Sequence, residues 1–264
     1  MSIKPILKRL VPERYEPQVR RIFYAIRALW YTGHRFICPI CGRRFRKFIL
    51  TKPWYDIQCP GCGSLRRHRL LWLYLKERTK FFTDHLKVLH VSPMYCLWEK
   101  FRRLRNIDYV TADLSSPIAK VKLDVTNIDM PDDQFDCIIC YHVLEHIPDD
   151  RRAMRELFRV LKPGGWAILQ VPVDLDRDTT FEDPGLSSPE ERERIFGQKD
   201  HVRIYGRDYE DRLKEAGFIV NLDWYVKELD EKLINRYGIR RDEVIYFCVK
   251  PKEVSTEAMK MKFI

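Results

Sequence analysis

The sequence predicts an α/β protein built on a doubly wound, mostly parallel sheet, preceded by a small metal-binding module. Two observations carry this prediction. From about residue 85, short apolar runs alternate with segments of helical periodicity, which is the pattern of strands joined by crossover helices. Before that point, two Cys-x-x-Cys pairs stand 17 residues apart, a spacing typical of zinc ribbons.

The charge of the chain is concentrated at its start. The 264 residues carry a formal charge of +10, and residues 1–80 alone hold 19 basic and 4 acidic side chains. A basic module favours a polyanionic partner such as RNA, a phosphorylated carrier or a lipid surface. Arg66, Arg67 and Arg69 crowd the start of a predicted helix, where positive charge opposes the helix dipole, and are expected to meet an anion. A merely solvated basic face remains the alternative.

A basic amphipathic helix is expected within residues 1–33. Its apolar side is formed by Ile22, Ala25, Ile26, Leu29 and Trp30. Such a helix can lie on a membrane surface, although packing against the rest of the protein is favoured. No apolar run approaches the length of about 20 residues that crosses a bilayer, and the start lacks a signal-peptide core. We therefore expect a soluble, cytoplasmic protein.

A zinc ribbon is expected over residues 34–66. Each Cys-x-x-Cys pair can form a tight turn that points two thiolates at one ion. Gly42 and Gly63 follow the pairs and allow backbone amides to turn toward the sulfurs. Two unrelated reduced pairs are the alternative. The expected ligands of the structural zinc ion are Cys38, Cys41, Cys59 and Cys62.

The elements after the ribbon follow in order. A connecting helix is expected over residues 67–84. Cys137 and Cys140 lie in an apolar strand, where side chains three apart point to opposite faces, so both are expected in the core. Further strands are expected at 87–92, 108–114, 122–126, 135–143, 165–173, 218–226 and 243–250, and helices at 96–104, 148–165 and 207–218.

Two features stand apart from this alternation. A polar segment over residues 174–200 interrupts it, and loops of that length are often functional. The last two strands follow each other with no obvious helix between them, which predicts an antiparallel hairpin at one edge of the sheet. Residues 252–264 are expected to form a tail.

In a doubly wound sheet, ligands bind at the carboxyl ends of the strands, beside the point where the strand order reverses. Asp113 follows the second strand, and its carboxylate suits both hydroxyls of a ribose. Asp124 follows the third strand and can accept from an adenine amine. Each alone is an ordinary loop aspartate, but together they favour an adenosine-type ligand.

Residues 123–172 contain three recognisable motifs. They are an acidic residue before Pro-Asp-Asp-x-Phe-Asp, the strand end Val-Leu-Glu-His-Ile, and Glu-Leu-x-Arg-Val-Leu-Lys-Pro-Gly-Gly. This segment resembles the middle of class I S-adenosylmethionine-dependent methyltransferases of the type 11 group. The resemblance covers residues 85–251 and implies a Rossmann-like, seven-stranded methyltransferase domain. Residues 196–206 resemble a segment of a subgroup that also carries an N-terminal zinc ribbon.

The resemblance implies where the cofactor S-adenosylmethionine binds. Asp113 would hold its ribose, Asp124 and Val125 would flank the adenine, and Tyr141 would approach the methionine part. The full set of implied contacts is His90, Ser92, Pro93, Asp113, Leu114, Asp124, Val125 and Tyr141.

One departure from the family concerns the turn after the first strand. The family has a glycine-rich turn there, whereas this chain has no glycine between Gly63 and Gly164. Ser92 and Pro93 form an N-cap and first-turn pair instead, which would let a helix N-terminus face the cofactor carboxylate. Loss of cofactor binding is the alternative.

The candidate bases and acceptor contacts are histidine-rich. His142, His146 and His201 are candidate proton acceptors, because imidazole titrates near neutral pH. The segment after the insert is expected to contact the acceptor through Asp200, His201, Arg203 and Tyr205. The predicted function is thus methyl transfer, with the basic N-terminus and ribbon recruiting RNA or another anionic acceptor. A small-molecule, sugar or lipid-linked acceptor and a catalytically inactive binding protein are the alternatives.

Overall fold

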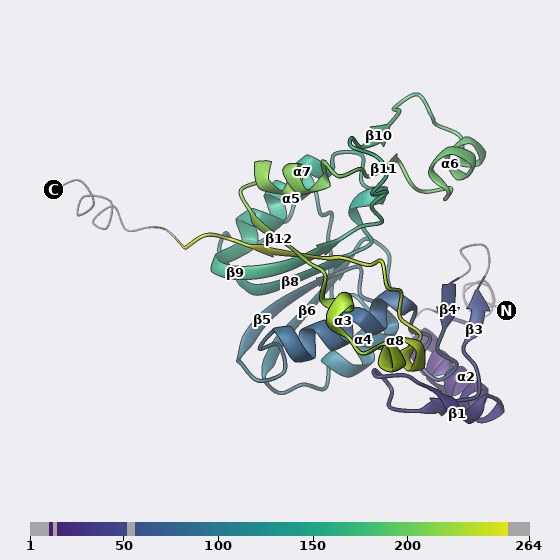
Figure 1. The fold of residues 1–264 in the computed structure, drawn as a ribbon. Helices are drawn as coiled ribbons and strands as arrows, with labels where there is room; N and C mark the ends of the chain where they lie inside the picture. Colours follow the sequence, from purple (N-terminus) through teal and green to yellow (C-terminus); the bar gives the residue numbers. More distant parts are fainter. Residues whose placement is uncertain (1–10, 13–14, 52–55, 253–264) are drawn as a thin grey trace. The chain divides into compact units, whose positions relative to one another are not determined.

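The computed structural model describes residues 11–12, 15–51 and 56–252 (Figure 1). Seven strands form the main sheet, in the order β12-β13-β9-β8-β5-β6-β7. Their bounds are β5 Leu86–Val91, β6 Ile107–Asp113, β7 Val121–Lys122, β8 Phe135–Tyr141, β9 Leu161–Gln170, β12 Ile219–Asp223 and β13 Ile245–Val249. The strand order reverses between β5 and β8, as in a doubly wound fold.

The pairing within the sheet is mostly parallel. β5 pairs with β8, β8 with β9, and β6 with β7 in parallel, whereas β13 runs antiparallel to β9. The predicted Rossmann-like, seven-stranded fold is confirmed. The predicted hairpin without a helix is wrong, because a 3-10 turn (η3, Tyr225–Glu228) and helix α8 (Glu231–Tyr237) lie between β12 and β13. Asp230 caps α8 by accepting from the Lys232 amide, and Ile234 is the only residue that this helix buries, which leaves little apolar periodicity to detect.

The chain divides into two compact units. One holds Met1–Leu86, Pro93–Lys122 and Asp223–Ile245, and the other holds Lys87–Ser92, Leu123–Leu222 and Tyr246–Ile264. The domain boundaries expected from the sequence remain predictions. Of the predicted tail, residues 253–264 lie outside the described residues.

In the first unit, the module that carries the two cysteine pairs is built from short elements. β1 pairs with β2, and β3 pairs with β4, both antiparallel. The module is flanked in sequence by two helices, one before it and one after it. The elements are α2 Glu16–Trp30, β1 Thr32–Ile37, β2 Arg44–Phe45, β3 Ile49–Thr51, β4 Asp56–Gln58 and α3 Arg66–Arg78.

Helix α2 packs with the side opposite to the predicted one. Leu29 is 76% exposed and Trp30 74% exposed, and Ile22 and Ile26 are also exposed. Tyr24 and Ala28 are the buried residues of this helix. The expectation that the apolar side packs on the protein is therefore wrong. Tyr24 is the large side chain that this helix buries, and it packs against Gly63 of the ribbon. Aromatic side chains bury a large area when they pack in this way.

In the second unit, β5, β8 and β9 form an apolar core. Cys137 and Cys140 are completely buried there, as expected. Helix α5 (Asp150–Val160) follows β8 and begins two residues later than expected, because Asp149 accepts from the Arg152 amide and acts as its N-cap. Among the described residues, no helix combines the length and apolar composition that crossing a bilayer requires.

The polar segment 174–200 is partly ordered into regular elements. Strand β10 (Phe181–Glu182) pairs antiparallel with β11 (Arg203–Ile204). Helix α6 (Pro189–Phe196) lies between them in sequence (Figure 1). The Ser188 side chain accepts from the Glu191 amide at the start of this helix. Helix α7 (Tyr209–Glu215) follows. The segment thus contains one short strand and one helix, within the second unit.

Candidate functional site

Four thiols converge in the first unit. The sulfur atoms of Cys38, Cys41, Cys59 and Cys62 all lie within 4.8 Å of one another. Cys38 Sγ is 3.6 Å from Cys62 Sγ, and Cys41 Sγ is 3.8 Å from Cys59 Sγ. Tetrahedral zinc with Zn–S bonds of about 2.3 Å places its sulfurs about 3.8 Å apart. The cluster therefore fits a zinc ribbon.

The two knuckle turns depend on their glycines. Gly42 and Gly63 have φ of 72° and 76°, a region open to glycine without strain. Their amides donate to the carbonyls of Cys38 and Cys59 at 2.8 and 3.0 Å, whereas the sequence suggested the sulfurs as acceptors. The Gly61 amide does donate to Cys59 Sγ, at 3.3 Å.

Buried polar groups surround the cluster. Ser64 is completely buried, and its Oγ lies 3.4 Å from Cys38 Sγ and 3.3 Å from Cys62 Sγ. Burial by itself would raise the pKa of the Cys38 thiol, but hydrogen bonds from the neighbouring thiols and Ser64 outweigh it and hold that pKa well below its usual range. A low pKa favours the thiolate, which is the form that binds metal.

The arginines at the start of α3 are less available than expected. Arg69 is completely buried; its guanidinium donates to the carbonyl of Ser64 at 2.7 Å and stacks over Phe48 at 4.5 Å. Arg66 and Arg67 lie 3.5 and 3.6 Å from the carboxylate oxygens of Asp56. The expectation that Arg69 contacts an anionic partner is wrong, because its guanidinium is buried and donates to backbone carbonyls, so a partner cannot reach it.

Two strands of the second unit end in strained turns. Ser92 follows β5 with φ of 49°, and His142 follows β8 with φ of 59°. Residues other than glycine rarely adopt this left-handed region. Ser92 thus takes the backbone conformation that a glycine would adopt. The predicted Ser92–Pro93 cap is wrong, because helix α4 (Tyr95–Phe101) has Met94 at its N-cap and no side-chain cap.

The strand residues expected to touch a cofactor are buried. His90 is completely buried in β5, and burial lowers its pKa to about 3. Tyr141, the last residue of β8, is also buried, whereas the next residue, His142, is partly exposed. His90 and Tyr141 therefore belong to the core of the sheet and offer almost no surface to a ligand in this conformation.

The two predicted adenosine contacts form tight turns at strand ends. In the first unit, Asp113 closes β6, and its Oδ1 accepts from the amides of Ser115 and Ser116 at 2.7 and 2.8 Å. Leu114 beside it is exposed.

In the second unit, Asp124 Oδ1 accepts from the amide and the hydroxyl of Thr126, both at 2.8 Å. These bonds lower the pKa of Asp124, while Val125 is buried. The expected strand over 122–126 is wrong, because β7 ends at Lys122. A turn closed by Asp124 and Asn127 takes its place.

A histidine–carboxylate cluster follows β8 in the second unit. His142 Nδ1 lies 3.0 Å from Glu145 Oε1, and the rings of His146 and His201 pack edge to face at 4.8 Å. Burial would raise the pKa of Glu145, but the hydrogen bond and charge of His142 lower it overall. Burial lowers the pKa of His201. His201 is thus buried with its ring neutral, while the side chains of His142 and His146 reach the surface.

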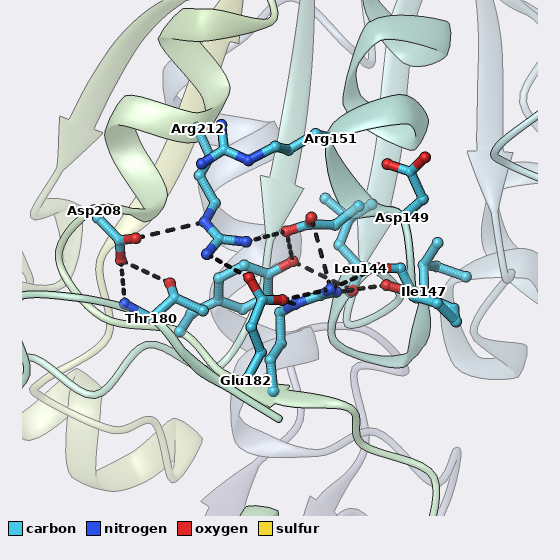
Figure 2. A network of polar contacts seen from close by, with 12 residues as sticks. Leu144, Ile147, Asp149, Arg151, Thr180, Glu182, Asp208 and Arg212 are labelled. Atoms are coloured by element: carbon cyan, nitrogen blue, oxygen red, sulfur yellow. Dashed lines mark hydrogen bonds and ion pairs between the residues drawn. The ribbon is translucent and has the colours of Figure 1, made fainter. Parts of the chain in front are cut away.

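Arg203 and Tyr205 form part of a buried polar network (Figure 2). Arg203 donates to the carbonyls of Leu144 and Pro148 at 3.0 and 2.8 Å. The Tyr205 hydroxyl donates to Asp150 Oδ2 at 2.7 Å. The prediction that Arg203 and Tyr205 contact an acceptor is wrong in this conformation, because both are buried and their polar atoms are occupied.

The structure thus brings together part of the predicted set of candidate bases and acceptor contacts. His146 and His201 are neighbours, and Asp200 lies beside His146, with its Oδ2 3.4 Å from His146 Nδ1. Glu145, which is 2% exposed, was not among the residues predicted from the sequence. Its signal was a carboxylate directly before a histidine at the end of an apolar strand, an environment in which a buried charge needs a partner.

The methyltransferase-domain family matches residues 68–221, more than half of the chain. A ubiquinone/menaquinone biosynthesis C-methyltransferase, UbiE, of Proteus mirabilis is 34% identical over 88 residues, which are 26% of this chain and 35% of that protein. UbiE of Vibrio cholerae is 42% identical over 45 residues, which are 17% of each chain. The chain thus spans about a third of the length of these curated relatives or less.

Among solved structures, the (4+2)-cyclase SpnF has a TM-score of 0.51 at 16% identity. The match covers 91% of this chain and 97% of that chain. At this identity the likeness concerns the fold alone, and the same fold can host different reactions.

Proposed function

The chain belongs to the methyltransferase-domain family, and from this premise we propose that it transfers a methyl group from S-adenosylmethionine to an acceptor. The observation that carries the proposal is the family match over residues 68–221, which covers the carboxyl ends of β5, β6 and β8. In this strand order those ends flank the reversal point where open α/β sheets bind ligands. S-adenosylmethionine would supply the methyl group, and the chain would bind and orient it.

Three residues are proposed to hold the cofactor. Asp113 accepts from backbone amides through Oδ1, so its second oxygen would accept from the ribose hydroxyls. Asp124 is fixed in the same way by Thr126 and would accept from the adenine amine. Ser92 already has the left-handed backbone of a glycine, so the glycine-free turn would follow the same backbone path past the cofactor, with the Ser92 side chain added at the contact.

Calorimetry with S-adenosylmethionine tests this proposal. The wild-type chain should bind it, and Asp113→Asn should bind about 10–100-fold more weakly, because a charge-assisted hydrogen bond is worth about 1.5–3 kcal/mol. Asparagine keeps the Oδ1 acceptor for the two amides but loses the second one. Asp108→Asn, at the exposed start of the same strand, is the matched control. A folded wild-type chain without affinity would favour the catalytically inactive binding protein.

We also propose that the four-cysteine cluster binds one structural zinc ion. The short sulfur–sulfur distances support it. Metal analysis of a reduced preparation should find zinc, and Cys41→Ser should lose it. Cys96→Ser is the matched control, because Cys96 is a buried cysteine outside the cluster. Zinc retained equally by both variants would contradict the assignment.

An anionic acceptor, with RNA as the first class to test, is proposed to bind the ribbon. Exposed cations line its strands, and a surface hollow of about 500 Å³ lies beside them. The hollow is lined by β1 and α8, through His34, Arg35, Phe36, Lys232, Asn235 and Arg236. Its several cations and one aromatic side chain suit a phosphate with an attached base or sugar.

A lipid-linked acceptor is the second candidate, and a specific observation favours it. The exposed side of α2 carries Ile22, Ile26, Leu29 and Trp30, and Arg21 beside them is exposed as well. Exposed apolar residues together with basic ones are typical of helices that lie in a membrane interface. A peripheral membrane contact is therefore compatible with this helix.

One pair of variants separates the two acceptor classes. Arg35→Glu should weaken binding to single-stranded RNA and reduce its salt dependence, because one phosphate contact is lost. Trp30→Glu should abolish sedimentation with anionic phospholipid vesicles, because it removes apolar surface that the helix would bury in the membrane interface. Each variant serves as the control for the other assay. RNA binding that survives Arg35→Glu, or vesicle binding that survives Trp30→Glu, would refute the corresponding acceptor surface. A cytoplasmic location remains a prediction.

A further inference from the structure

We propose that Glu145, His146 and His201 bind a divalent transition-metal ion at the end of β8, distinct from the ion of the four cysteines. One donor atom from each residue lies within 4.8 Å of the others. Two imidazoles and one carboxylate form a ligand set that suits zinc, iron, cobalt and nickel rather than magnesium or calcium. The proposal concerns ion binding and does not depend on methyl transfer.

The distances require only a small contraction. Metal–nitrogen and metal–oxygen bonds of about 2.0–2.2 Å place neighbouring ligand atoms about 3.0–3.5 Å apart. The three donors, spread over as much as 4.8 Å, would each move by about 1 Å. Side-chain rotation supplies that movement in Glu145 and His146, which lie in a short 3-10 turn (η2, Leu144–His146).

Two buried atoms at this place have no hydrogen-bond partner among the described residues. They are Glu145 Oε2 and His201 Nε2, on side chains that are 2% and 6% exposed respectively. Leaving a buried polar atom unpaired costs about 1–3 kcal/mol, and more if it is charged. Both atoms are acceptors when the carboxylate is ionised and Nε2 is unprotonated, so they cannot satisfy each other. A cation between them would satisfy both.

The surrounding hydrogen bonds leave the correct lone pairs free. His146 Nδ1 lies 3.1 Å from the Asp200 carbonyl; since a carbonyl only accepts, Nδ1 carries the proton and the lone pair is on Nε2. His201 bonds the backbone of Phe196, and because its Nε2 has no partner, that bond is made by Nδ1. His142 holds Glu145 Oε1 at 3.0 Å. This is the outer-shell pattern that orients metal ligands.

The cluster is held firmly and remains open on one side. Arg203 donates to the carbonyls of Leu144 and Ile147 on either side of Glu145 and His146, which fixes the turn that presents both ligands. The His146 side chain is 30% exposed, so the ion would face solvent on that side. Three protein ligands leave at least one position for water or for an oxygen atom of an acceptor.

The experiment uses the full chain with its cysteines already loaded with zinc. Cobalt(II) chloride is titrated by calorimetry and by visible absorption, in which thiolate charge-transfer bands would reveal entry into the cysteine cluster. We expect one further cobalt ion per chain, without those bands. Glu145→Gln and His201→Gln should weaken its binding at least about 100-fold, because each removes a direct ligand. His85→Gln, at an exposed histidine elsewhere, should leave it unchanged.

His146→Gln guards against misfolding of the two buried variants. Its side chain is partly exposed, so the variant should keep the circular dichroism spectrum of the wild type and still lose cobalt binding. A folded wild-type chain that takes up no second ion would overturn the proposal, and the two free acceptors would then be bridged by water. Equal cobalt affinity in wild type, His146→Gln and His85→Gln would also overturn it.

Discussion

Replacing Arg203 by methionine is expected to destabilise the second unit strongly. The guanidinium of Arg203 donates to the carbonyls of Leu144, Ile147 and Pro148, which lie in the turn after β8. It also donates to Glu182 Oε2 on β10, the strand that pairs with β11, to which Arg203 belongs. Figure 2 labels Leu144, Ile147 and Glu182 in this network. Methionine is of similar length and fills much of the same space, but it donates no hydrogen bond. The change therefore isolates the polar contribution of the brace.

The size of the destabilisation depends on which partners of Arg203 lose their hydrogen bonds. Glu182 keeps a bond from Arg212 at 3.0 Å, and its side chain is 39% exposed, so water can replace part of what it loses. Asp150 keeps Arg212 and Tyr205. The Leu144 carbonyl keeps the Ile147 amide and the Tyr205 hydroxyl, so the loss falls mainly on the carbonyls of Ile147 and Pro148. Leaving a buried acceptor without a partner costs about 1–3 kcal/mol, so the two together cost about 2–6 kcal/mol, which is a large share of the stability of a domain.

Urea unfolding followed by circular dichroism measures this loss. With an m-value of about 2 kcal/mol/M, the midpoint should fall by about 2 M. Arg207→Met is the matched control, because Arg207 pairs with Asp178 at the surface, with side chains 62% and 88% exposed. Such pairs contribute at most about 1 kcal/mol. If Arg203→Met and Arg207→Met shift the midpoint equally, the buried network does not brace this turn.

Three further predictions concern backbone strain, pH and burial of charge. Gly42→Ala should lower the free energy of unfolding by about 1 kcal/mol, through its positive φ alone. Gly63→Ala should lower it by at least twice as much, because the added Cβ would also lie 2.2 Å from Tyr24 Oη. Similar urea midpoints for the two variants would contradict this. Burial lowers the pKa of His90 from 6.5 to about 3 in the folded chain. Its contribution to the free energy of unfolding is therefore complete above pH 6.5. As the pH falls from there toward 3, this contribution decreases by up to about 1.4 kcal/mol per pH unit. His90→Gln should flatten the pH dependence of the urea midpoint, and an unchanged slope would refute it. Arg69→Met should lower the free energy of unfolding by at least about 2 kcal/mol, because the carbonyls of Tyr237 and Gly238 lose their donor and each costs about 1–3 kcal/mol. A loss below about 1 kcal/mol would show that these contacts contribute little.

The fold was predictable because its signals are local. β8 and the second half of β9 (residues 166–170) are largely buried, so they appear in the sequence as nearly continuous apolar runs. The cysteine pairs carry their own spacing, and the structure brings their sulfurs within 4.8 Å. Helix α8 was not predicted because Ile234 is the only residue that it buries, so no apolar face repeats along it. Helices α4 and α7 are equally short but bury three residues each.

The site was harder to predict because burial depends on distant partners. The segment containing Arg203 and Tyr205 is polar in sequence, which suggested acceptor contacts. Their burial is made possible by Asp150 and Glu182, carboxylates more than 20 residues away. The sequence near Arg203 does not indicate these partners. For the same reason Glu145 was missed, since its significance depends on His201, which is 56 residues further along the chain.

The strained ends of β5 and β8 connect these observations. Ser92 and His142 adopt left-handed conformations at the ends of two directly paired parallel strands. Such strain persists only where the surroundings impose it. For His142 the constraint is visible: its amide donates to the Gln170 carbonyl at 2.7 Å, and its ring is bonded to Glu145. A relaxed backbone at His142 would turn the ring away and release Glu145 Oε1. The strain is therefore part of what aims the other oxygen of Glu145 toward His201.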